Sequence, residues 1–477
     1  MADNIPTYQS KLLLEALQLE GIRFAHWKGN QHIMESLEGL SDIEILVDPK
    51  DKPAFEKIMN KLRFKKAISP KWNAYPYVED WVGFDKETGN LLHLHTHYAI
   101  VTGIKYVKHL YLPWLDEYFS HLKIDENSGW PIPIPELESI VLFIRVWAKM
   151  PPKKRLNKSP EVPEKRLEEL LGLLHQCEDE KLSSTCEKLQ IKTPERFLET
   201  INKIRLEGDQ KEIIRLSKHF YKQVKAHYRK SWISSLAQSY YYTYYLKVAS
   251  FFFRFFSPMR FKKKLNSEGK IIALIGSDGA GKSTLSKDIV KWLTFKLDTH
   301  YFYLGKYPFI QSYDKVLFSL SNLLHSKSTL SKKLRKILGD YYYLMLPQKK
   351  IDMLHQANKI REGGSLVICD RFPQNNVYGM HDGPQLQNGV PTEKSTKELS
   401  LFKKIEQMEP DMIFKLMVSP EIAIQRKSSH NPAMIKQKCD KLDNISFKNA
   451  KVIEIDTSMP YDKVLLNIKN EIWNNLS

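Results

Sequence analysis

Cysteine is scarce in this chain, and the few cysteines present have no spacing typical of metal ligands. They are Cys177, Cys186, Cys369 and Cys439. A structural zinc site usually needs cysteines a few residues apart, and a disulfide-stapled domain usually needs a denser set. These cysteines instead fit a reducing compartment, and we expect a cytoplasmic protein.

The chain also lacks the features of a cleavable targeting segment. After Met1 it reads Ala-Asp-Asn-Ile-Pro, with neither a basic stretch nor an apolar core. Secretory signal peptides carry both features, so none is predicted. No internal repeat of fixed period is present, and 477 residues suffice for two or three domains.

No single block of lysine and arginine dominates, although the chain is strongly basic. The 73 Lys and Arg residues outnumber the 55 Asp and Glu residues, and the formal net charge is +18. Such a charge favours polyanionic partners, namely nucleotides, nucleic acid or an anionic membrane surface. Because the lysines are spread along the whole chain, a generally basic surface explains the same excess, and both interpretations stay open.

The apolar pattern divides this α/β chain into three predicted domains. Residues 1–150 mix helix-like and strand-like segments, as in an α+β domain. Residues 151–265 read as an almost wholly helical connector, which opens with a linker-like run rich in proline and lysine. Residues 266–477 alternate short apolar runs with amphipathic helical stretches, which is typical of a parallel α/β sheet.

Five short apolar runs of the third domain are predicted to form its parallel sheet. They are Ile271–Ile275, Tyr301–Leu304, Leu366–Cys369, Met412–Val418 and Lys451–Ile455. Strands that are buried on both faces read as such near-continuous apolar runs. Because parallel sheets bind ligands at the carboxyl ends of their strands, we expect the functional residues directly after these runs.

A phosphate-binding loop follows the first of these runs. Gly276–Thr284 reads Gly-Ser-Asp-Gly-Ala-Gly-Lys-Ser-Thr and leads into a predicted helix, Thr284–Leu293. The glycines let successive backbone N–H groups point at phosphate oxygens, and the helix N-terminus adds partial positive charge. We expect Lys282 to reach the β- and γ-phosphates of ATP, and Ser283 to offer its hydroxyl to Mg²⁺. A glycine-rich turn without a ligand is the simpler alternative.

An aspartate and an arginine follow the third run. A carboxylate at the end of a buried strand, here Asp370, suits the water shell of a magnesium ion. The adjacent Arg371 could hold a phosphate with two parallel hydrogen bonds. Alone, this pair could be a surface ion pair, but downstream of a phosphate-binding loop we predict a functional role.

These motifs resemble the thymidylate kinase family over most of the third domain. The resemblance rests on the phosphate-binding loop and on Asp370-Arg371-Phe372. It extends to two later segments, Val418-Ser-Pro-Glu-Ile-Ala-Ile-Gln-Arg-Lys and Val452-Ile-Glu-Ile-Asp-Thr-Ser. The fold that the resemblance implies is a P-loop NTPase fold with a parallel five-stranded sheet.

The resemblance also implies roles for individual residues. Asp278 would contact the sugar hydroxyl of an acceptor nucleotide, and Arg371 would contact the acceptor's phosphate. Arg426 would begin a lid near the ATP, and the loop Asp456–Pro460 would border the adenine. The predicted catalytic residues are Lys282, Asp370, Arg371 and Arg426. The predicted nucleotide-binding residues are Gly276, Asp278, Gly279, Ala280, Gly281, Lys282, Ser283, Thr284 and Asp456.

The chain departs from that family where thymidylate kinases help to read thymine. After Asp-Arg the family usually has a serine and an Ala-Tyr-Gln stretch. This chain has Pro373-Gln-Asn-Asn-Val-Tyr378, followed by Met380-His-Asp-Gly-Pro384, and its lid region 427–444 is lysine-rich without arginine. Phosphoryl transfer is therefore better supported than thymidylate specificity. The acceptor could be dTMP, another nucleotide or a phosphorylated small molecule.

Two carboxylates in the first domain form a second candidate metal site. Asp42 and Glu44 are two residues apart on a predicted strand, so both point to one face. Such a pair beside a glycine turn can bridge magnesium ions that hold a triphosphate. With Lys28-Gly29 upstream, the pattern resembles a bacterial group of the nucleotidyltransferase fold over residues 10–100.

The third carboxylate of that group is missing here. Where the group has Asp-Leu-His, this chain reads His93-Leu94-His95, and its second carboxylate is glutamate. An active nucleotidyltransferase, an inactive ligand-binding relative, and a different fold with one solvated acidic strand face therefore stay open. His93, His95 and His97 alternate along a strand, and they could ligate a transition metal or form a half-exposed polar face.

A stretch of the connector is almost uncharged and rich in aromatic residues. Trp232–Phe256 contains only Lys247 and Arg254 as charged residues. Its serines and many tyrosines argue against a bilayer span, although the length would barely allow one. It could lie on a membrane surface as a helix flanked by basic residues, or pack between the domains.

Two functional hypotheses follow from these motifs. The first is an enzyme with an ATP- and Mg²⁺-dependent kinase domain, joined to a nucleotidyltransferase-like domain. The second is a nucleotide-gated binding or scaffold protein that engages nucleic acid or a membrane. Asp278, Arg371 and Arg426 accompany the phosphate-binding loop. Because a pure binding protein would not need that set, we favour the enzyme.

Overall fold

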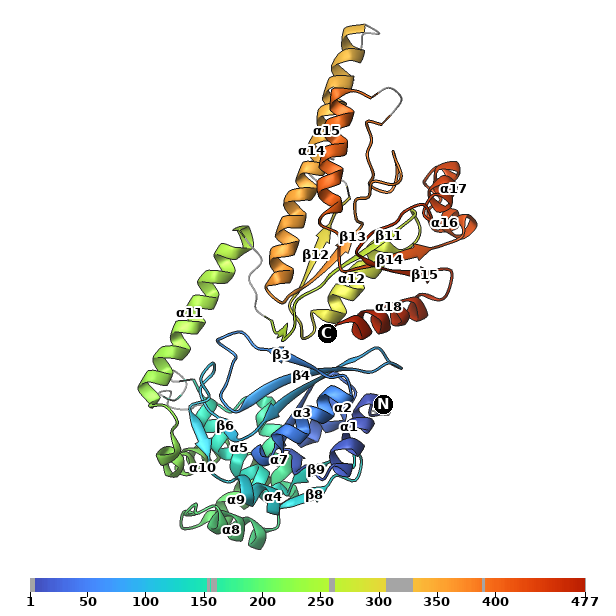
Figure 1. The fold of residues 1–477 in the computed structure, drawn as a ribbon. Helices are drawn as coiled ribbons and strands as arrows, with labels where there is room; N and C mark the ends of the chain where they lie inside the picture. The colour runs from blue at the N-terminus through green and yellow to red at the C-terminus, as the bar shows by residue number, and fades with distance from the viewer. Residues whose placement is uncertain are drawn as a thin grey trace. The chain divides into compact units, whose positions relative to one another are not determined.

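The computed structural model divides the chain into two compact units, and each is described by itself. The first unit comprises residues 1–263 and the second unit residues 264–477. Figure 1 colours the chain by residue number. The structure describes residues 5–151, 155, 161–256, 262–305, 329–387 and 391–476. Part of the linker-like run at the start of the predicted connector lies outside these ranges.

The second unit is built on a parallel sheet of the five strands that the sequence predicts. The strand order is β12-β13-β11-β14-β15, and every neighbouring pair is parallel. The strands are β11 (Ile271–Gly276), β12 (Thr299–Tyr303), β13 (Leu366–Asp370), β14 (Met412–Met417) and β15 (Lys451–Asp456). Chain order reverses at the central strand β11, which is where sheets of this kind form a ligand crevice.

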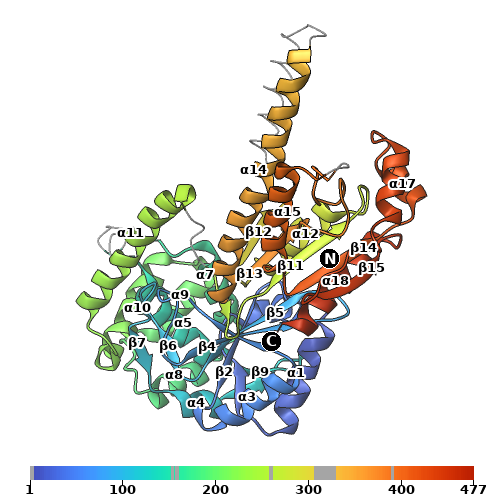
Figure 2. The ribbon, with the colours of Figure 1, turned by 45° about the horizontal axis from the view of Figure 1, so that its top comes forward.

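Helices cover both faces of this sheet. The second unit contains the short strand β10 (Lys264–Leu265) and the helices α12 (Lys282–Leu293), α14 (Thr329–Glu362), α15 (Glu393–Glu406), α16 (Pro420–Arg426), α17 (Pro432–Asp440) and α18 (Tyr461–Asn475). Ile271, Ala273 and Ile275 of β11 share one hydrophobic core with α14 and α15, which lie side by side in Figures 1 and 2. Because side chains alternate along a strand, Ile272 and Leu274 point to the opposite face.

The first unit has a mixed sheet. Its strands follow the order β1-β2-β5-β4-β3, in which β2 and β5 are parallel and the other neighbours antiparallel. These strands are β1 (Phe24–His26), β2 (Asp42–Val47), β3 (Lys65–Ile68), β4 (Val78–Phe84) and β5 (Leu91–His97). Two antiparallel pairs join β6 (Ile100–Thr102) with β7 (Leu110–Leu112), and β8 (Leu122–Ile124) with β9 (Pro131–Pro133).

Helices of the predicted connector pack into the first unit. The helices of this unit are α1 (Tyr8–Leu19), α2 (Ile33–Leu37), α3 (Lys52–Lys61), α4 (Leu115–Ser120), α5 (Pro135–Lys149), α7 (Glu164–Gln176), α8 (Asp179–Lys188), α9 (Phe197–Glu207), α10 (Gln210–Gln223) and α11 (Trp232–Phe256). Short 3₁₀ turns are η1 (Asn30–His32), η2 (Pro49–Asp51) and η3 (Val224–His227). One hydrophobic core joins Trp27 and β1 to α5, α7, α8, α9 and α10. Residues 164–223 therefore pack with the first 150 residues.

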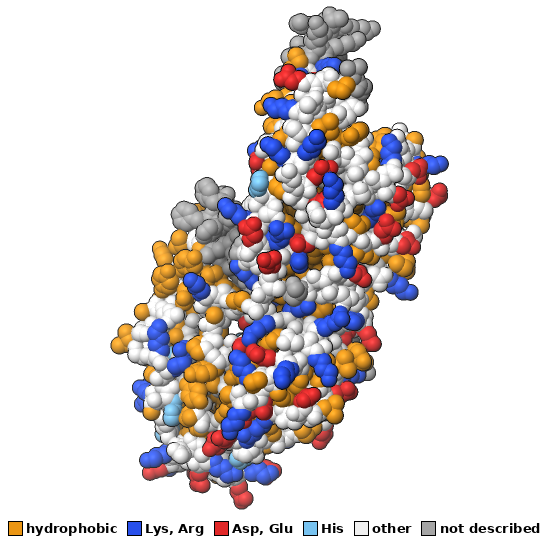
Figure 3. Space-filling model, viewed as in Figure 1, with side chains coloured by type: hydrophobic (Ala, Val, Ile, Leu, Met, Phe, Trp, Pro, Cys, Tyr) orange, Lys and Arg blue, Asp and Glu red, His pale blue; other side chains and the backbone are white. Residues whose placement is uncertain are grey.

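The aromatic stretch forms the single helix α11. Ser235 and Ala249 on this helix are buried, whereas many of its large side chains are exposed. The exposed ones are Ile233, Tyr240, Tyr241, Tyr244, Tyr245, Val248 and Phe251. Hydrophobic side chains gather over α11 at the left of Figure 3, where lysines and arginines are scattered over the visible face. The side chains of residues 252–256 lie outside the described part. None of the described helices combines the length and the apolar character needed to cross a bilayer.

Candidate functional site

The loop between β11 and α12 forms a tight turn in front of the helix N-terminus. Gly279 and Gly281 both have φ of 88°, a left-handed conformation that favours glycine. A Cβ atom on Gly279 would lie 2.6 Å from the carbonyl oxygen of Ala423. Gly281 is the N-cap of α12 and supplies no side-chain acceptor. The first N–H groups of this helix are therefore available to an anion.

Lys282 is the first residue of α12, and its side chain folds back over the loop. Its Nζ donates to the carbonyl oxygens of Gly276 at 2.9 Å and Ser277 at 2.6 Å. Burial, followed by the charge of Arg371, lowers the pKa of Lys282 to about 8. The ammonium group is thus held inside the curl of the loop. The next two residues, Ser283 and Thr284, are exposed at the start of the helix.

Asp370 lies beside this loop because β13 pairs with β11. Its Cα is opposite that of Leu274, and the residue is fully buried. The hydroxyl of Tyr301 donates to Asp370 Oδ2 at 2.9 Å, whereas Oδ1 is buried without a hydrogen-bond partner. A buried carboxylate oxygen without a donor needs a cation or water to satisfy it. Asp370 and the exposed hydroxyl of Ser283 therefore fit the predicted Mg²⁺.

Arg371 turns the chain directly after β13. Its φ of 74° is left-handed, which is uncommon for a residue with a side chain. The guanidinium lies 3.7 Å from Asp278 Oδ1 and 3.6 Å from Asp382 Oδ2. The strained backbone thus holds the guanidinium between the phosphate-binding loop and the segment that follows β13.

A cavity of about 360 Å³ is lined by Arg371 and its neighbours. The charged residues of its lining are Asp278, Lys350, Arg371, Asp382, Glu398 and Lys438. Aromatic walls come from Tyr303, Tyr343 and Phe402. Lys350 Nζ lies 3.3 Å from Asp382 Oδ1, and Lys438 pairs with Asp278. A cavity of this volume is in the range that holds small organic ligands.

The two aspartates of this cavity are ionised. Burial would raise the pKa of Asp278, but the hydrogen bond and charge of Lys438 outweigh this effect and lower it to about 2. Burial likewise opposes ionisation of Asp382, but Lys350 and Arg371 lower its pKa. Each aspartate therefore neutralises cations that an anionic ligand would otherwise meet.

Sequence reasoning missed four charged residues of this cavity, and one of them is Glu398 from α15. Lys350 comes from α14, Asp382 from the segment after β13, and Lys438 from α17. The departure from thymidylate kinases at residues 380–384 is a usable signal for Asp382. The lysine-rich lid points to Lys438, but only as one lysine among several. Nothing in the sequence separates Lys350 from the other lysines of α14.

Arg426 ends α16 and contacts the loop that follows β15. Its Nη2 donates to the carbonyl oxygen of Thr457 at 3.0 Å. In the same loop, Asp456 accepts hydrogen bonds from the backbone N–H and the hydroxyl of Ser458, at 2.8 Å and 2.6 Å. The structure therefore brings Arg426 together with the predicted adenine loop. The carboxylate of Asp456 stabilises the turn of that loop.

In the first unit, Asp42 and Glu44 face histidines of the neighbouring strand β5. The register pairs Asp42 with His93 and Glu44 with His95. Nδ1 of His93 lies 2.8 Å from Asp42 Oδ1, and its Nε2 lies 3.0 Å from Asp80 Oδ1. Asp42 and Glu44 thus lie on one strand face, and an imidazole stands where the third carboxylate of the nucleotidyltransferase pattern would be.

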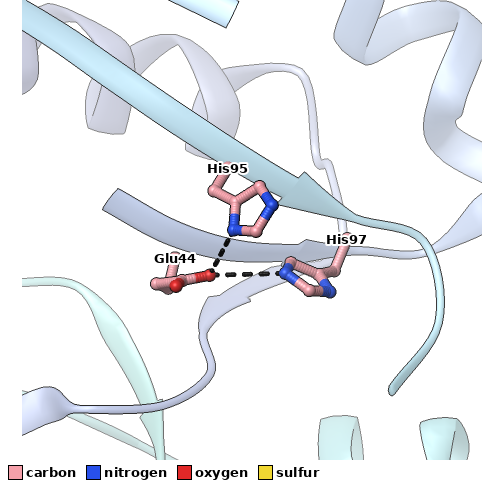
Figure 4. A group of neighbouring side chains, drawn as sticks. All are labelled: Glu44, His95 and His97. Carbon is pink, nitrogen blue, oxygen red and sulfur yellow. Dashed lines mark hydrogen bonds and ion pairs between the residues drawn. The ribbon is translucent and has the colours of Figure 1, made fainter. Parts of the chain in front are cut away.

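Glu44 contacts two histidines through one carboxylate oxygen, as Figure 4 shows. Its Oε2 is 3.0 Å from His95 Nδ1 and 3.3 Å from His97 Nε2. Lys28 Nζ approaches the same oxygen at 2.8 Å. Burial is the main cause that lowers the pKa of both His95 and His97, so both rings are neutral at pH 7. The side chains of His95 and His97 are 17% and 0% exposed, and the predicted half-exposed histidine face is therefore buried.

The glycine turn after β1 is occupied by a carboxylate from α5. The N–H of Gly29 donates to Glu138 Oε1 at 2.8 Å, and Asn30 Nδ2 donates to Glu138 Oε2 at 2.6 Å. Burial raises the pKa of Glu138 to about 7. Sequence reasoning missed Glu138, which is 109 residues from Gly29 along the chain. These hydrogen-bond donors of the turn are thus already bound to a carboxylate of the same unit.

Known proteins resemble the C-terminal part of the chain, although no family model matches it. The uncharacterized ATP-binding protein YghR of Escherichia coli (strain K12) is 30% identical over 217 residues, with 41% of this chain and 83% of YghR covered. The uncharacterized ATP-binding protein YghS of the same strain is 29% identical over 214 residues, covering 41% of this chain and 89% of YghS. Thymidylate kinase of Rickettsia conorii is 27% identical over 172 residues, covering 34% of this chain and 72% of that kinase. The chain therefore belongs to the family of YghR, and its second unit is a P-loop kinase-like domain related at low identity to thymidylate kinases.

Proposed function

We propose that the second unit is an ATP-dependent phosphotransferase of the nucleoside-monophosphate kinase type. It transfers the γ-phosphate of ATP to an acceptor that already carries a phosphate, and dTMP is the best single candidate. The observation that carries this proposal is the position of Arg371, which lies between the phosphate-binding loop and a cavity of about 360 Å³. A protein that only held ATP would not need an arginine and a cavity there.

Some residues of the site bind the phosphates of the donor, and others bind the phosphate of the acceptor. Lys282 and the N–H groups of the loop steady the transferred phosphoryl group. Arg371 holds the acceptor's phosphate in line with it. Ser283 and Asp370 would hold Mg²⁺, which supplies further charge neutralisation when bound. No general base is required, because the oxygen of an acceptor phosphate is already nucleophilic at neutral pH.

The lining of the cavity keeps acceptors other than dTMP as candidates beside it. Gly379, Met380, His381 and Asp382 line it, and these residues belong to the segment that departs from thymidylate kinases. Arg371 and Lys350 are both paired with Asp382. An acceptor phosphate would compete with this carboxylate for both cations, so the site favours a dianionic phosphate over a singly charged group.

A direct test is a screen of nucleoside monophosphates and sugar phosphates with γ-labelled ATP and the intact chain. We expect label transfer to at least one acceptor and none in the Lys282→Ala variant. Transfer to dTMP alone would establish thymidylate kinase activity. If ATP binds but no acceptor in either class is labelled, the kinase proposal is wrong.

The affinity for ATP is expected to fall as the pH rises through about 8. Lys282 attracts phosphate only when its amino group is protonated. With a pKa of about 8, the protonated fraction drops about tenfold between pH 7 and pH 9. Calorimetric titrations with Mg-ATP should therefore give a Kd about tenfold higher at pH 9. Lys282→Arg keeps its charge over this range and should lose the dependence. A wild-type Kd that stays constant from pH 7 to pH 9 would contradict this prediction.

Replacing Asp370 by asparagine is expected to lower kcat by about 100-fold with a much smaller effect on the KM for ATP. The substitution removes the charge of the buried carboxylate while keeping its shape, so cation binding should suffer most. The matched control is Tyr301→Phe, which removes the hydrogen bond to Oδ2 but keeps the carboxylate. Magnesium titrations of kcat check both variants, and equal losses in the two would argue against the role of Asp370.

For the first unit, we infer a nucleotidyltransferase-like domain that binds a ligand without catalysis. Two observations favour this reading over an active enzyme. His93 replaces the third carboxylate and engages Asp42, and Glu138 occupies the donors of the glycine turn. Purified protein should incorporate no labelled nucleotide from any of the four NTPs into itself or added acceptors. Incorporation that is lost in Asp42→Asn would overturn the inference.

A second candidate function rests on the exposed aromatic side chains of α11. In that case the protein is a nucleotide-gated binding protein, and the helix lies on an anionic membrane surface. Cosedimentation with anionic liposomes should then be salt-sensitive and should weaken when Tyr241 and Tyr244 are both replaced by serine. Binding of this kind, together with no labelled acceptor in the screen, would favour this function over the kinase.

A further inference from the structure

The group of Glu44, His95 and His97 in the first unit has no part in the proposed kinase chemistry. Its three ligand atoms come from two adjacent parallel strands, β2 and β5. All lie within 4.8 Å of one another, and Glu44 Oε2 is the atom shared by both imidazoles. Figure 4 shows one carboxylate oxygen joined to a nitrogen of each ring.

We propose that Glu44, His95 and His97 bind a transition-metal dication of the zinc type. Two imidazoles and a carboxylate are the ligands that such ions take in many three-residue protein sites. Ligands around a tetrahedral zinc at about 2.0–2.1 Å are separated by roughly 3.3 Å. The separations of 3.0 Å and 3.3 Å seen here are close to that spacing.

His97 supplies the independent observation that this group needs a ligand. The residue is fully buried, yet neither ring nitrogen has a hydrogen-bond partner. Nε2 comes within 3.3 Å of Glu44 Oε2 but without the alignment of a hydrogen bond. Burying an imidazole without a well-aligned hydrogen bond to either nitrogen is costly. A metal ion on Nε2 would remove part of that cost.

The donor set favours a transition metal over magnesium at this position. Magnesium prefers oxygen ligands and keeps several waters, whereas imidazole nitrogen suits zinc, cobalt, nickel and copper. The neighbouring oxygens of Asp42 and Asp80 are both taken by His93. The sheet therefore contains one nitrogen-rich set around Glu44 and a separate hydrogen-bonded set around His93.

Lys28 is the competitor for this site. Its Nζ contacts Glu44 Oε2 at 2.8 Å and also lies 4.4 Å from the centre of the Trp27 ring. A metal bound to Oε2 would have to displace the ammonium from that oxygen, and the Trp27 face remains as its alternative contact. Lys108, another partly buried lysine, acts electrostatically on His97 in the same region. Metal affinity should therefore depend on the charge of Lys28.

The experiment uses the intact chain, stripped with a chelator and free of nucleotide. Titration with Co²⁺ should produce the intense visible absorption of a four- or five-coordinate ion, saturating at one equivalent, and Zn²⁺ should abolish it by displacement. His95→Gln and Glu44→Gln should each weaken Co²⁺ binding by at least about tenfold. The matched control is His93→Gln on the same strand, which should keep wild-type affinity.

Lys28→Met provides a second readout that a purely structural cluster would not give. Removing the competing ammonium should tighten Co²⁺ binding by about tenfold. The proposal is overturned if wild-type protein gives only the weak spectrum of aqueous cobalt. It is also overturned if His93→Gln weakens binding as much as His95→Gln, or if Lys28→Met fails to tighten it. These outcomes are independent of whether the second unit is a kinase.

Discussion

Replacement of Lys282 by alanine is expected to abolish measurable phosphoryl transfer, with kcat lowered at least about 1000-fold, or about 4 kcal/mol of transition-state stabilisation. Lys282 is buried within the loop and donates to two of its carbonyl oxygens. The same ammonium can turn from these neutral acceptors to phosphate oxygens, where it compensates developing negative charge. Alanine leaves the loop amides in place but removes the only side-chain cation of the loop.

Lys287 provides the matched control for this substitution. It lies on the same helix α12 but is exposed, so Lys287→Ala should retain activity close to that of the intact chain. Single-turnover kinetics with labelled ATP separate binding from chemistry in both variants. A Lys282→Ala protein that folds, binds ATP and still transfers phosphate at more than about a tenth of the wild-type rate would remove Lys282 from the mechanism.

The second unit could be predicted largely from local sequence features. The apolar runs around Ile271 and Leu366 identify buried parallel strands without any knowledge of tertiary contacts. The glycine spacing before Lys282 fixes the loop, because Gly279 and Gly281 adopt the left-handed φ that other residues avoid. A sheet of parallel strands then places the residues after each strand at one edge. Each of these strands and the loop is therefore specified by residues that lie close together in the sequence.

Most of the charged lining of the cavity could not be predicted in the same way. Lys438 pairs with Asp278 over 160 residues of chain, and Lys350 pairs with Asp382 over 32 residues. Lysines are common in this chain, so their presence on a helix does not indicate which of them turns inward. Such contacts depend on how α14 and α17 pack, and no local pattern encodes that packing.

The histidines of β5 show a different limit of sequence reasoning. Alternating His93, His95 and His97 on a strand suggests a polar face toward water, as on an ordinary half-exposed sheet. The structure buries this face, because α5 and its neighbours form a core on the side of Trp27. Buried neutral imidazoles beside Glu44 can act together as ligands for an ion, whereas exposed imidazoles would be solvated by water. The core that covers this face combines α5 with helices α7–α10 of the predicted connector, and no local pattern along β5 indicates these contacts.

The cavity and the phosphate-binding loop share Asp278, and this residue links the donor site to the acceptor site. Asp278 lies within the loop but forms an ion pair with Lys438 and approaches Arg371. In the resemblance to thymidylate kinases, the corresponding carboxylate contacts the acceptor's sugar. A ligand in the cavity that takes Arg371 or Lys438 from Asp278 would therefore alter a residue of the ATP-binding loop. Binding of donor and acceptor should consequently be coupled.

Replacing Arg371 by alanine is expected to raise the KM for the phosphorylated acceptor by about 100-fold, with the KM for ATP changed by less than about threefold. The guanidinium lies beside the cavity, next to Asp278 and Asp382. Its loss removes the charge-assisted hydrogen bonds to the acceptor's phosphate, and the two carboxylates that remain repel that phosphate. Arg371→Lys should recover only part of the loss, because an ammonium cannot make two parallel hydrogen bonds to the phosphate.

The control is Arg361→Ala, which removes an arginine that pairs with Asp411 instead. Initial-rate measurements with each substrate varied in turn separate the two constants. A rise confined to the KM for ATP would show that Arg371 acts on the donor, and the cavity would then not be the acceptor site.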